Sequence, residues 1–174
     1  MRCVVLIGFM GAGKTTVGRQ LAKRLRGKFL DLDDVIEQRE QKSVANIFAA
    51  SGEAAFRRME SAALNALLQD READGDLVLA LGGGAFVQEQ NRAALDATGA
   101  ITVLLEAPLE ELRRRCDGES KVRPLAQERA KFAELFAARR ADYALARFTV
   151  QTLDKPVKQV TAEIEGLLKR QKRR

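Results

Sequence analysis

The clearest chemical signature lies at Gly8–Thr15, where GFMGAGKT matches the pattern G-x-x-x-x-G-K-[ST]. An apolar run at Cys3–Ile7 precedes it and an amphipathic run at Lys14–Leu25 overlaps its end, so we expect a strand, a loop and a helix. Glycines let backbone N–H groups turn toward phosphate oxygens, and the helix N-terminus adds positive charge. Lys14 would reach the β- and γ-phosphates, and Thr15 would offer its hydroxyl to Mg²⁺. The pattern predicts nucleotide binding and leaves the reaction open.

Three carboxylates lie at the end of a second predicted strand, where FLDLDD contains Asp31, Asp33 and Asp34. Ligands of open α/β sheets bind outside the carboxyl ends of the strands. Residues two apart on a strand point the same way, so Asp31 and Asp33 could serve one site. One would hold Mg²⁺ and the other a substrate hydroxyl. Helix capping is an equally good interpretation, because Asp33 or Asp34 would make a suitable N-cap for DVIEQRE.

The segment IFAASGEAAFRRMES places Phe56, Arg57 and Glu60 along one side of a predicted helix, Ser51–Leu68. Adjacent arginines differ by about 100° around a helix, so only one of Arg57 and Arg58 can face a given pocket. A guanidinium beside phenylalanine rings suits an anionic small molecule with an apolar ring face. Taken alone, the segment fits core phenylalanines with surface arginines better.

Gly82, Gly83 and Gly84 directly follow a predicted buried strand in LALGGGA. Glycine loses more backbone entropy on folding than other residues, so three in a row suggest close approach of a ligand to bare backbone, with a plain sharp turn as the alternative. Farther along the chain, Arg123 lies in a predicted loop, and Arg139 precedes Tyr143 by one helical turn. An arginine on a mobile loop is what phosphoryl transfer uses to neutralise transition-state charge.

Composition excludes several classes of function. The chain has no histidine, which rules out Ser-His-Asp catalysis and histidine metal sites. The net charge is +6, but the last six residues, KRQKRR, carry five positive charges and leave the rest at +1. We therefore expect a solvated basic tail at 169–174 and no nucleic-acid partner. Two cysteines and no apolar run of about 20 residues favour a cytoplasmic protein without a membrane span.

Short apolar runs alternate with longer helical segments, which predicts an α/β fold with a parallel sheet covered on both faces. Without repeats or linkers, residues 1–174 are expected to form a single domain. A loop is predicted around 117–126, and an amphipathic helix contains Val157, Ile164 and Leu168. The predicted strands are Cys3–Ile7, Lys28–Leu32, Leu77–Leu81, Ile101–Leu105 and Arg147–Gln151.

Together the motifs resemble those of the shikimate kinase family. GFMGAGKTT, FLDLDD, IFAASGEAAFRRME, LGGGA, VRPL and the arginine-to-tyrosine spacing occur in the family's order between Gly8 and Tyr143. The resemblance implies a three-layer nucleoside-monophosphate-kinase-like fold, with a five-stranded parallel sheet in the order 2-3-1-4-5 and a mobile lid at about 114–126. It also implies transfer of the γ-phosphate of ATP to the 3-hydroxyl of shikimate with Mg²⁺, in the pathway to chorismate and the aromatic amino acids. We expect the protein to be a monomer.

Site residues carry over from the family to matching positions. The resemblance implies catalytic roles for Asp33, Lys14 and Arg123, and Mg²⁺ ligation by Thr15 and Asp31. For ATP it implies Gly11, Ala12, Gly13, Lys14, Thr15, Thr16, Arg115 and Arg123, with Arg115 stacking on adenine. For shikimate it implies Asp33, Arg57, Gly82, Gly83, Arg139, Phe48 and Phe56, with Arg57 and Arg139 gripping the carboxylate.

The sequence departs from the family pattern at several places. The lid reads RPLA where RPLL is usual, and Gln151 stands where an aspartate is common, so an adenine contact from Pro156 is weakly supported. Arg140 competes with Arg139, which is preferred for its spacing to Tyr143. Two other functions remain open: a kinase of another polyol acid such as gluconate, and a nucleotide-binding regulatory protein without turnover.

Overall fold

The protein is described here by a computed structural model covering residues 2–69, 75–117 and 129–171. Within these ranges one parallel sheet has the strand order β2-β3-β1-β4-β5, which confirms the predicted order. Its strands are β1 (Cys3–Ile7), β2 (Lys28–Asp31), β3 (Leu77–Ala80), β4 (Ile101–Glu106) and β5 (Phe148–Gln151). Each agrees with its predicted range to within one residue at either end.

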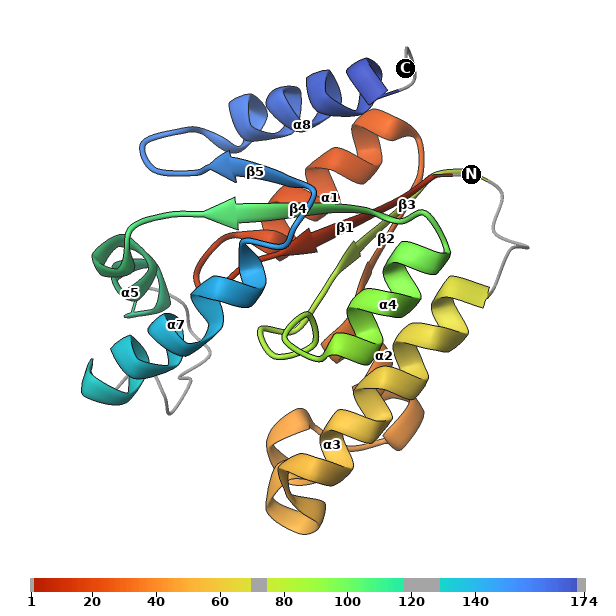
Figure 1. Ribbon diagram of the computed structural model, residues 1–174, viewed down its shortest axis with the longest axis vertical. Helices are drawn as coiled ribbons and strands as arrows, with labels where there is room; N and C mark the ends of the chain where they lie inside the picture. The colour runs from red at the N-terminus through yellow and green to blue at the C-terminus, as the bar shows by residue number, and fades with distance from the viewer. Residues whose placement is uncertain (1, 70–74, 118–128, 172–174) are drawn as a thin grey trace.

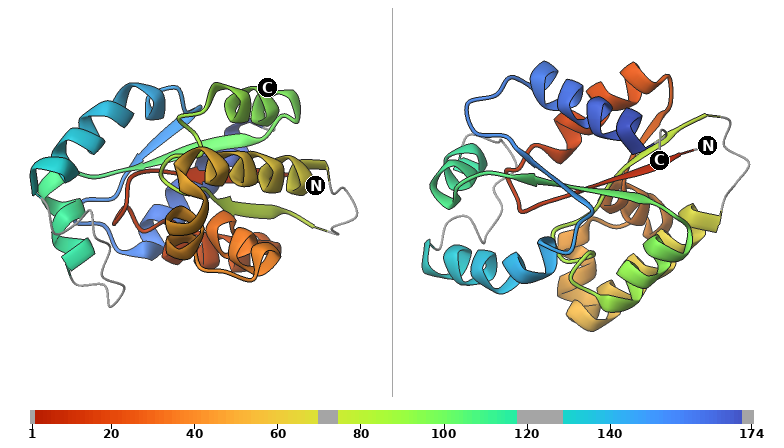
Figure 2. Two further views of the ribbon diagram at one scale, coloured as in Figure 1. Left: turned by 90° about the horizontal axis from the view of Figure 1, so that it is seen from below. Right: turned by 45° about the horizontal axis from the view of Figure 1, so that its top comes forward.

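Helices cover both faces of this sheet, which gives the predicted three layers (Figure 1). They are α1 (Lys14–Leu25), α2 (Leu32–Glu40), α3 (Val44–Gln69), α4 (Glu89–Ala97), α5 (Leu109–Asp117), α7 (Arg129–Tyr143) and α8 (Val157–Gln171). Helices α1 and α8 lie side by side on one face, and α3, α4 and α7 lie on the other (Figures 1 and 2). Helix α5 lies beyond the carboxyl end of β4. No helix in the described ranges is long and apolar enough to cross a membrane.

The core lies around the three central strands. All of β3 and nearly all of β1 and β4 are buried, whereas β2 and β5 at the edges are partly exposed. Strands buried on both faces read as continuous apolar runs, which is why VVLI, LVLA and ITVLL were recognisable in the sequence. On the α1 and α8 face, Leu21 and Ile164 are completely buried.

The register of the sheet places three of the predicted motifs at one edge. Asp31 at the end of β2 pairs with Ala80 at the end of β3, and Ala80 in turn pairs with Leu6 near the end of β1. The aspartates, the three glycines and the phosphate loop therefore leave the sheet from neighbouring strand ends. This edge is where ligands of open α/β sheets bind.

Two local predictions need correction. Strand β2 ends at Asp31, and Leu32 already begins α2, so Asp31 and Asp33 are not two residues of one strand. The helix expected at Ser51–Leu68 extends from Val44 to Gln69, with non-helical dihedrals at Gly52 (φ 74°, ψ 172°). Glycine adopts positive φ without the Cβ penalty of other residues, so the chain changes direction there and the helix resumes.

Candidate active site

The phosphate loop connects β1 to α1 with its glycines in the left-handed region. Gly11 has φ 78° and Gly13 has φ 87°. Gly13 occupies the N-cap of α1, where no described side chain caps the helix and the first turn contains no acidic residue. Lys14 folds back over the loop, and its Nζ donates to the carbonyls of Gly8 (2.8 Å) and Phe9 (3.2 Å). The loop therefore offers backbone N–H groups, a helix N-terminus and an ammonium group in one place, as phosphate binding requires.

Helix α5 supports this loop from outside. A Cβ atom on Gly11 would clash with the carbonyl oxygen of Leu112 and lie 3.0 Å from Sγ of Cys116. Only glycine can occupy this position without moving α5. The contact also places the C-terminal turn of α5, with Arg115, beside the predicted phosphate site.

Thr15 and Asp31 meet directly, as the predicted Mg²⁺ site requires. The Thr15 hydroxyl donates to Oδ2 of Asp31 at 2.9 Å, and Oδ1 of Asp31 accepts from the backbone N–H of Asp33 at 3.2 Å. Asp31 is therefore the N-cap of α2, whereas the capping alternative considered from the sequence named Asp33 or Asp34. Mg²⁺ in kinases commonly takes one or two protein oxygens and completes its shell with phosphates and water. A hydroxyl and a carboxylate side by side fit that donor set. The described residues contain no cluster of three or more acidic, cysteine or histidine ligands that could hold a metal without a nucleotide.

The three glycines after β3 lie against charged side chains from separate helices. A Cβ on Gly82 would lie 2.6 Å from Oδ1 of Asp33 and 3.2 Å from Oε1 of Glu60. On Gly83 it would lie 2.7 Å from Nη1 of Arg139, and on Gly84 it would overlap the Arg57 guanidinium. The turn thus brings the predicted acceptor residues Asp33, Arg57 and Arg139 together, and any larger residue would displace one of them.

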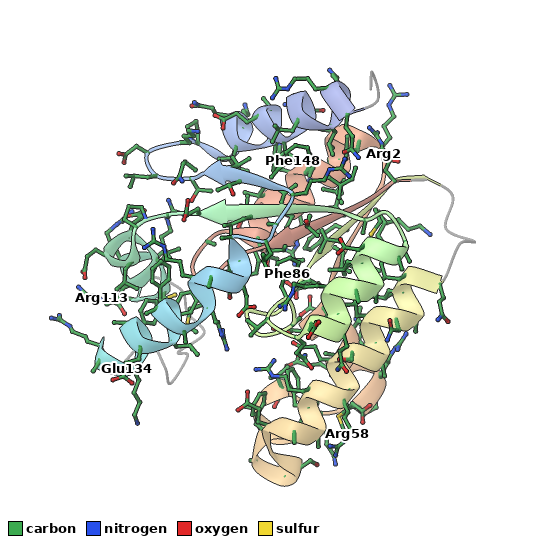
Figure 3. The ribbon with its side chains drawn as sticks, in the orientation of Figure 1. Arg2, Arg58, Phe86, Arg113, Glu134 and Phe148 are labelled. Carbon is green, nitrogen blue, oxygen red and sulfur yellow. The ribbon has the colours of Figure 1, made fainter. Side chains whose placement is uncertain are left out.

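Arg57 is oriented by two carboxylates of its own helix. Its Nη1 donates to Oε2 of Glu60 at 2.9 Å, and its Nη2 donates to Oε1 of Glu53 at 3.0 Å. Burial disfavours charge on Arg57, but the carboxylates of Glu60 and Glu53 outweigh it and raise its pKa. Arg58 is exposed and projects outward from α3 (Figure 3), so of the two arginines it is Arg57 that lies against the glycine turn.

Glu60 also lies in this cluster, although the sequence assigned it no role beyond its place beside Arg57 on the helix. It is completely buried, and Gln88 donates to its Oε2 at 2.8 Å alongside Arg57. Its other oxygen, Oε1, has no hydrogen-bond partner among the described residues. Burial raises the pKa of Glu60 and the charge of Arg57 opposes that shift. The spacing in FRRME placed Glu60 beside Arg57, but nothing in the sequence indicated its burial.

On α7, Arg139 rather than Arg140 reaches the glycine turn. The Arg139 guanidinium lies beside Gly83 and 5.9 Å from the centre of the Phe9 ring, whereas Arg140 is exposed and lines a separate cavity with Phe136. One turn farther along, the Tyr143 hydroxyl donates to the carbonyl of Gly83 at 2.5 Å. Burial raises the pKa of Tyr143. The preference for Arg139, based on its spacing to Tyr143, agrees with this geometry.

Arg115 lies at the other side of the phosphate loop. Its Nε donates to Glu111 at 2.7 Å, and its two terminal nitrogens donate to the hydroxyl (3.1 Å) and carbonyl (3.0 Å) of Thr152. These bonds lie in the guanidinium plane, so they hold the group in one orientation. Gln151, where the family often has aspartate, donates to the carboxylate of Glu106.

The remaining predicted residues divide into two groups. Phe48 and Phe56 pack together near Arg57 with ring centres 4.6 Å apart, and Phe56 is buried in the core, so their role as a pocket wall stays a prediction. Arg123 lies outside the described residues, as do most of the predicted lid and the end of the basic tail at 172–174.

A small pocket of about 80 Å³ joins the phosphate loop to Asp33, Gly82 and Gly83, whereas the other predicted acceptor residues, Arg57, Arg139, Phe48 and Phe56, are not among its lining residues. A cavity of about 560 Å³ lies at the opposite end of the sheet, around Arg2, Cys3 and Gly99, and contains none of the predicted site residues. The small pocket is lined by Gly11, Gly13, Lys14, Thr15, Thr16, Asp31, Asp33, Leu81, Gly82 and Gly83. A phosphoryl donor and its acceptor can therefore meet at one continuous surface.

Comparisons with known proteins identify the family of the chain. Residues 10–169 match the family model for shikimate kinase. A shikimate kinase from Persephonella marina is 35% identical over 97% of this chain and 100% of its own. A structure of shikimate kinase from Acinetobacter baumannii in complex with shikimate has a TM-score of 0.87 and 36% identity, covering 99% of this chain and 95% of that one.

The fold alone is shared more widely. A gluconokinase from Sinorhizobium meliloti 1021 has a TM-score of 0.61 at 15% identity, over 93% of this chain and 88% of that one. That likeness concerns architecture, whereas the family model and the relatives above match nearly the whole sequence. The chain belongs to the shikimate kinase family.

Proposed function

We propose that this chain transfers the γ-phosphate of ATP to the 3-hydroxyl of shikimate, with the phosphate loop holding the donor and the glycine turn holding the acceptor. Membership of the shikimate kinase family supports the reaction, which yields shikimate 3-phosphate and ADP. The observation that carries the residue assignment is the convergence of Asp33, Arg57 and Arg139 on Gly82–Gly84. A carboxylate and two guanidinium groups around bare backbone match an acceptor with hydroxyl groups and one anionic group.

On the donor side, the backbone N–H groups from Gly11 to Thr16 bind the β- and γ-phosphates. Lys14 adds its ammonium, which already lies over the loop. Arg115 presents a flat guanidinium, fixed by Glu111 and Thr152, on which the adenine ring stacks. The resemblance to the family adds Arg123 as the cation that meets the transferred group.

On the acceptor side, Arg57 and Arg139 bind the shikimate carboxylate and Asp33 binds its hydroxyl groups. The N–H groups of Gly82 and Gly83 add backbone contacts, and Phe48 and Phe56 form the wall beside the ring. Glu60 keeps Arg57 in place and leaves one oxygen, Oε1, pointing to the space above Gly82.

The chemistry then requires positioning and charge neutralisation more than covalent catalysis. The 3-hydroxyl oxygen forms a bond to the γ-phosphorus as the bond from that phosphorus to the β–γ bridging oxygen breaks. Asp33 orients the hydroxyl and accepts its proton late in the step. Lys14 and the loop amides stabilise the negative charge that develops on the leaving ADP.

Thr15 and Asp31 are the residues that would hold Mg²⁺, and the ion would supply positive charge to the phosphate oxygens. We further propose one domain over residues 1–174 that acts as a monomer in the cytoplasm, without a nucleic-acid partner. The single sheet and continuous core of the described residues support the domain assignment. The near balance of charge before residue 169 supports the exclusion of nucleic acid.

A coupled assay of ADP release over a panel of polyol acids tests the proposal. We expect turnover with shikimate and none with gluconate. Asp33→Asn should lower kcat about 10²- to 10⁴-fold, because it removes the proton acceptor, and should change the KM for ATP little. Turnover with gluconate instead of shikimate would assign the acceptor site to another substrate. ATP binding without turnover on any acceptor would favour a regulatory protein.

A further inference from the structure

We propose that Arg92 is a positioning residue for acceptor binding, because it connects the loop after the glycine turn to α7 and so holds Arg139 in place. The inference rests on the function proposed above, in which Arg139 binds the acceptor carboxylate. Arg92 lies on α4 and lines no part of the pocket between the phosphate loop and the turn. Its effect on the reaction would therefore be indirect.

The contacts of Arg92 join three elements through one atom. Its Nη1 donates to the carbonyls of Phe86 (2.8 Å) and Val87 (2.6 Å) and to Oδ1 of Asp142 on α7 (3.0 Å). The neighbouring Asn91 donates to the carbonyl of Ala85 at 2.8 Å. Side chains from the first turn of α4 thus bind the three consecutive carbonyls of residues 85–87. Arg92 also connects this loop to α7 through Asp142.

Few residues of helix α7 are buried, so polar contacts contribute to its attachment beside apolar packing. Of its fifteen residues only Phe132 and Tyr143 are fully buried. Phe132 and Phe136 pack edge-to-face on Phe9 with ring centres 5.0 Å and 5.4 Å away, which secures the N-terminal half of the helix. The C-terminal part is secured by the Arg92–Asp142 ion pair and by the hydrogen bond from Tyr143 to Gly83.

Arg139 lies about one helical turn before these two attachments. It is four residues before Tyr143 and three before Asp142, so all three project from the same end of α7. Figure 3 shows Phe86 in the interior where α7, α4 and the sheet come together. If α7 rotated or shifted, the Arg139 guanidinium would leave Gly83. Arg92 and Tyr143 together fix the distance between the glycine turn and α7, the helix that carries Arg139.

The main test replaces Arg92 with methionine, which keeps a long apolar stem and removes every donor. We expect the KM for shikimate to rise about tenfold, because acceptor placement loosens, with kcat and the KM for ATP within about twofold of wild type. In the wild type a single nitrogen of Arg92, Nη1, makes all three bonds. The one ammonium group of Arg92→Lys should therefore recover part of the lost shikimate binding. Asp142→Ala breaks only the ion pair and should give a smaller rise of about two- to fivefold.

A double-variant cycle separates positioning from general destabilisation. When Arg139→Ala is already present, adding Arg92→Met should change the KM for shikimate less than about twofold, since the positioned group is gone. A full tenfold effect in that background would overturn the proposal, and so would equal increases in the KM of both substrates. Arg24→Met is the matched control, because it breaks the Arg24–Glu165 ion pair between α1 and α8, away from the turn. It should leave both KM values unchanged.

Hydrogen exchange provides a readout that does not depend on activity. In the substrate-free protein, Arg92→Met should accelerate amide exchange at the C-terminal end of α7, over 139–143, and leave α1 unaffected. Unchanged exchange in α7 would overturn the proposal even if the wild type phosphorylates shikimate. If exchange in α7 accelerates but the wild type shows no turnover with shikimate, the attachment is established and the assigned function is wrong.

Discussion

Replacing Gly82 with alanine adds one methyl group at the point where the acceptor residues meet. The alanine Cβ would lie 2.6 Å from Oδ1 of Asp33, about 0.8 Å inside the 3.4 Å at which ordinary contacts begin. It would also lie 3.2 Å from the buried Oε1 of Glu60. Gly82 does not have the positive φ that would strain alanine, so the substitution acts through this overlap alone.

The overlap sets the size of the expected effect. Glu60 is completely buried and bonded to Arg57 and Gln88, so Asp33 has to move. A displacement of about 1 Å at a reacting group costs about 100-fold in rate. We therefore expect kcat/KM for shikimate to fall about 100-fold, with the KM for ATP nearly unchanged because the phosphate loop is untouched.

The assay is steady-state ADP release with each substrate varied in turn, together with thermal unfolding of every variant. Gly166→Ala is the matched control, since a Cβ there meets only Nη1 of Arg170, at 3.9 Å. It lies within α8, so alanine should stabilise the protein by about 1 kcal/mol and leave catalysis unchanged. Wild-type kcat/KM in Gly82→Ala would refute the placement of Asp33 against the turn. An equal loss toward ATP would point to a general distortion instead.

Two further predictions concern charged residues. Arg57→Ala should raise the KM for shikimate about 100-fold, because it removes one of the two cations that bind the shikimate carboxylate and leaves the buried Glu60 without its ion-pair partner. An unchanged KM in the same assay would show that Arg57 does not bind shikimate. Hydrogen bonds from Arg114 and, to a smaller extent, from Arg115 lower the pKa of Glu111 from 4.5 to about 2. Between about pH 2 and pH 4.5 the unfolded chain therefore binds more protons at Glu111 than the folded chain does. The stability that Glu111 contributes is thus present above pH 4.5 and lost as the pH falls toward 2. Urea unfolding of wild type and Glu111→Gln at several pH values should show a difference that shrinks on acidification, and a difference that grows would contradict the assignment.

The strands could be predicted from local apolar patterns, and their order in the sheet from the resemblance to the shikimate kinase family. VVLI and LVLA read as buried strands, and the glycine–lysine–threonine pattern marked the start of α1 at the observed residue, Lys14. The end of β2 was harder, since Asp31 can continue a strand or cap a helix. In the structure its side chain accepts a hydrogen bond from the N–H of Asp33, so Asp31 caps the helix.

Contacts between distant segments could not be predicted from the sequence. The motifs suggested Arg57, Arg139 and the three glycines separately, but which face of α7 meets Gly83 depends on how that helix packs. The burial of Glu60 and the bonds of Arg92 arise from the same packing. Each joins residues whose spacing along the chain gives no signal, such as Glu60 and Gln88, which are 28 residues apart.

Direct identification of the product tests the central claim, that the chain transfers the γ-phosphate of ATP to the 3-hydroxyl of shikimate. The chain would be incubated with ATP, Mg²⁺ and shikimate, and the products followed by phosphorus and proton NMR. We predict shikimate 3-phosphate and ADP in equal amounts, with no product when shikimate is omitted. Hydrolysis of ATP to free phosphate, or phosphorylation at another hydroxyl, would contradict the account.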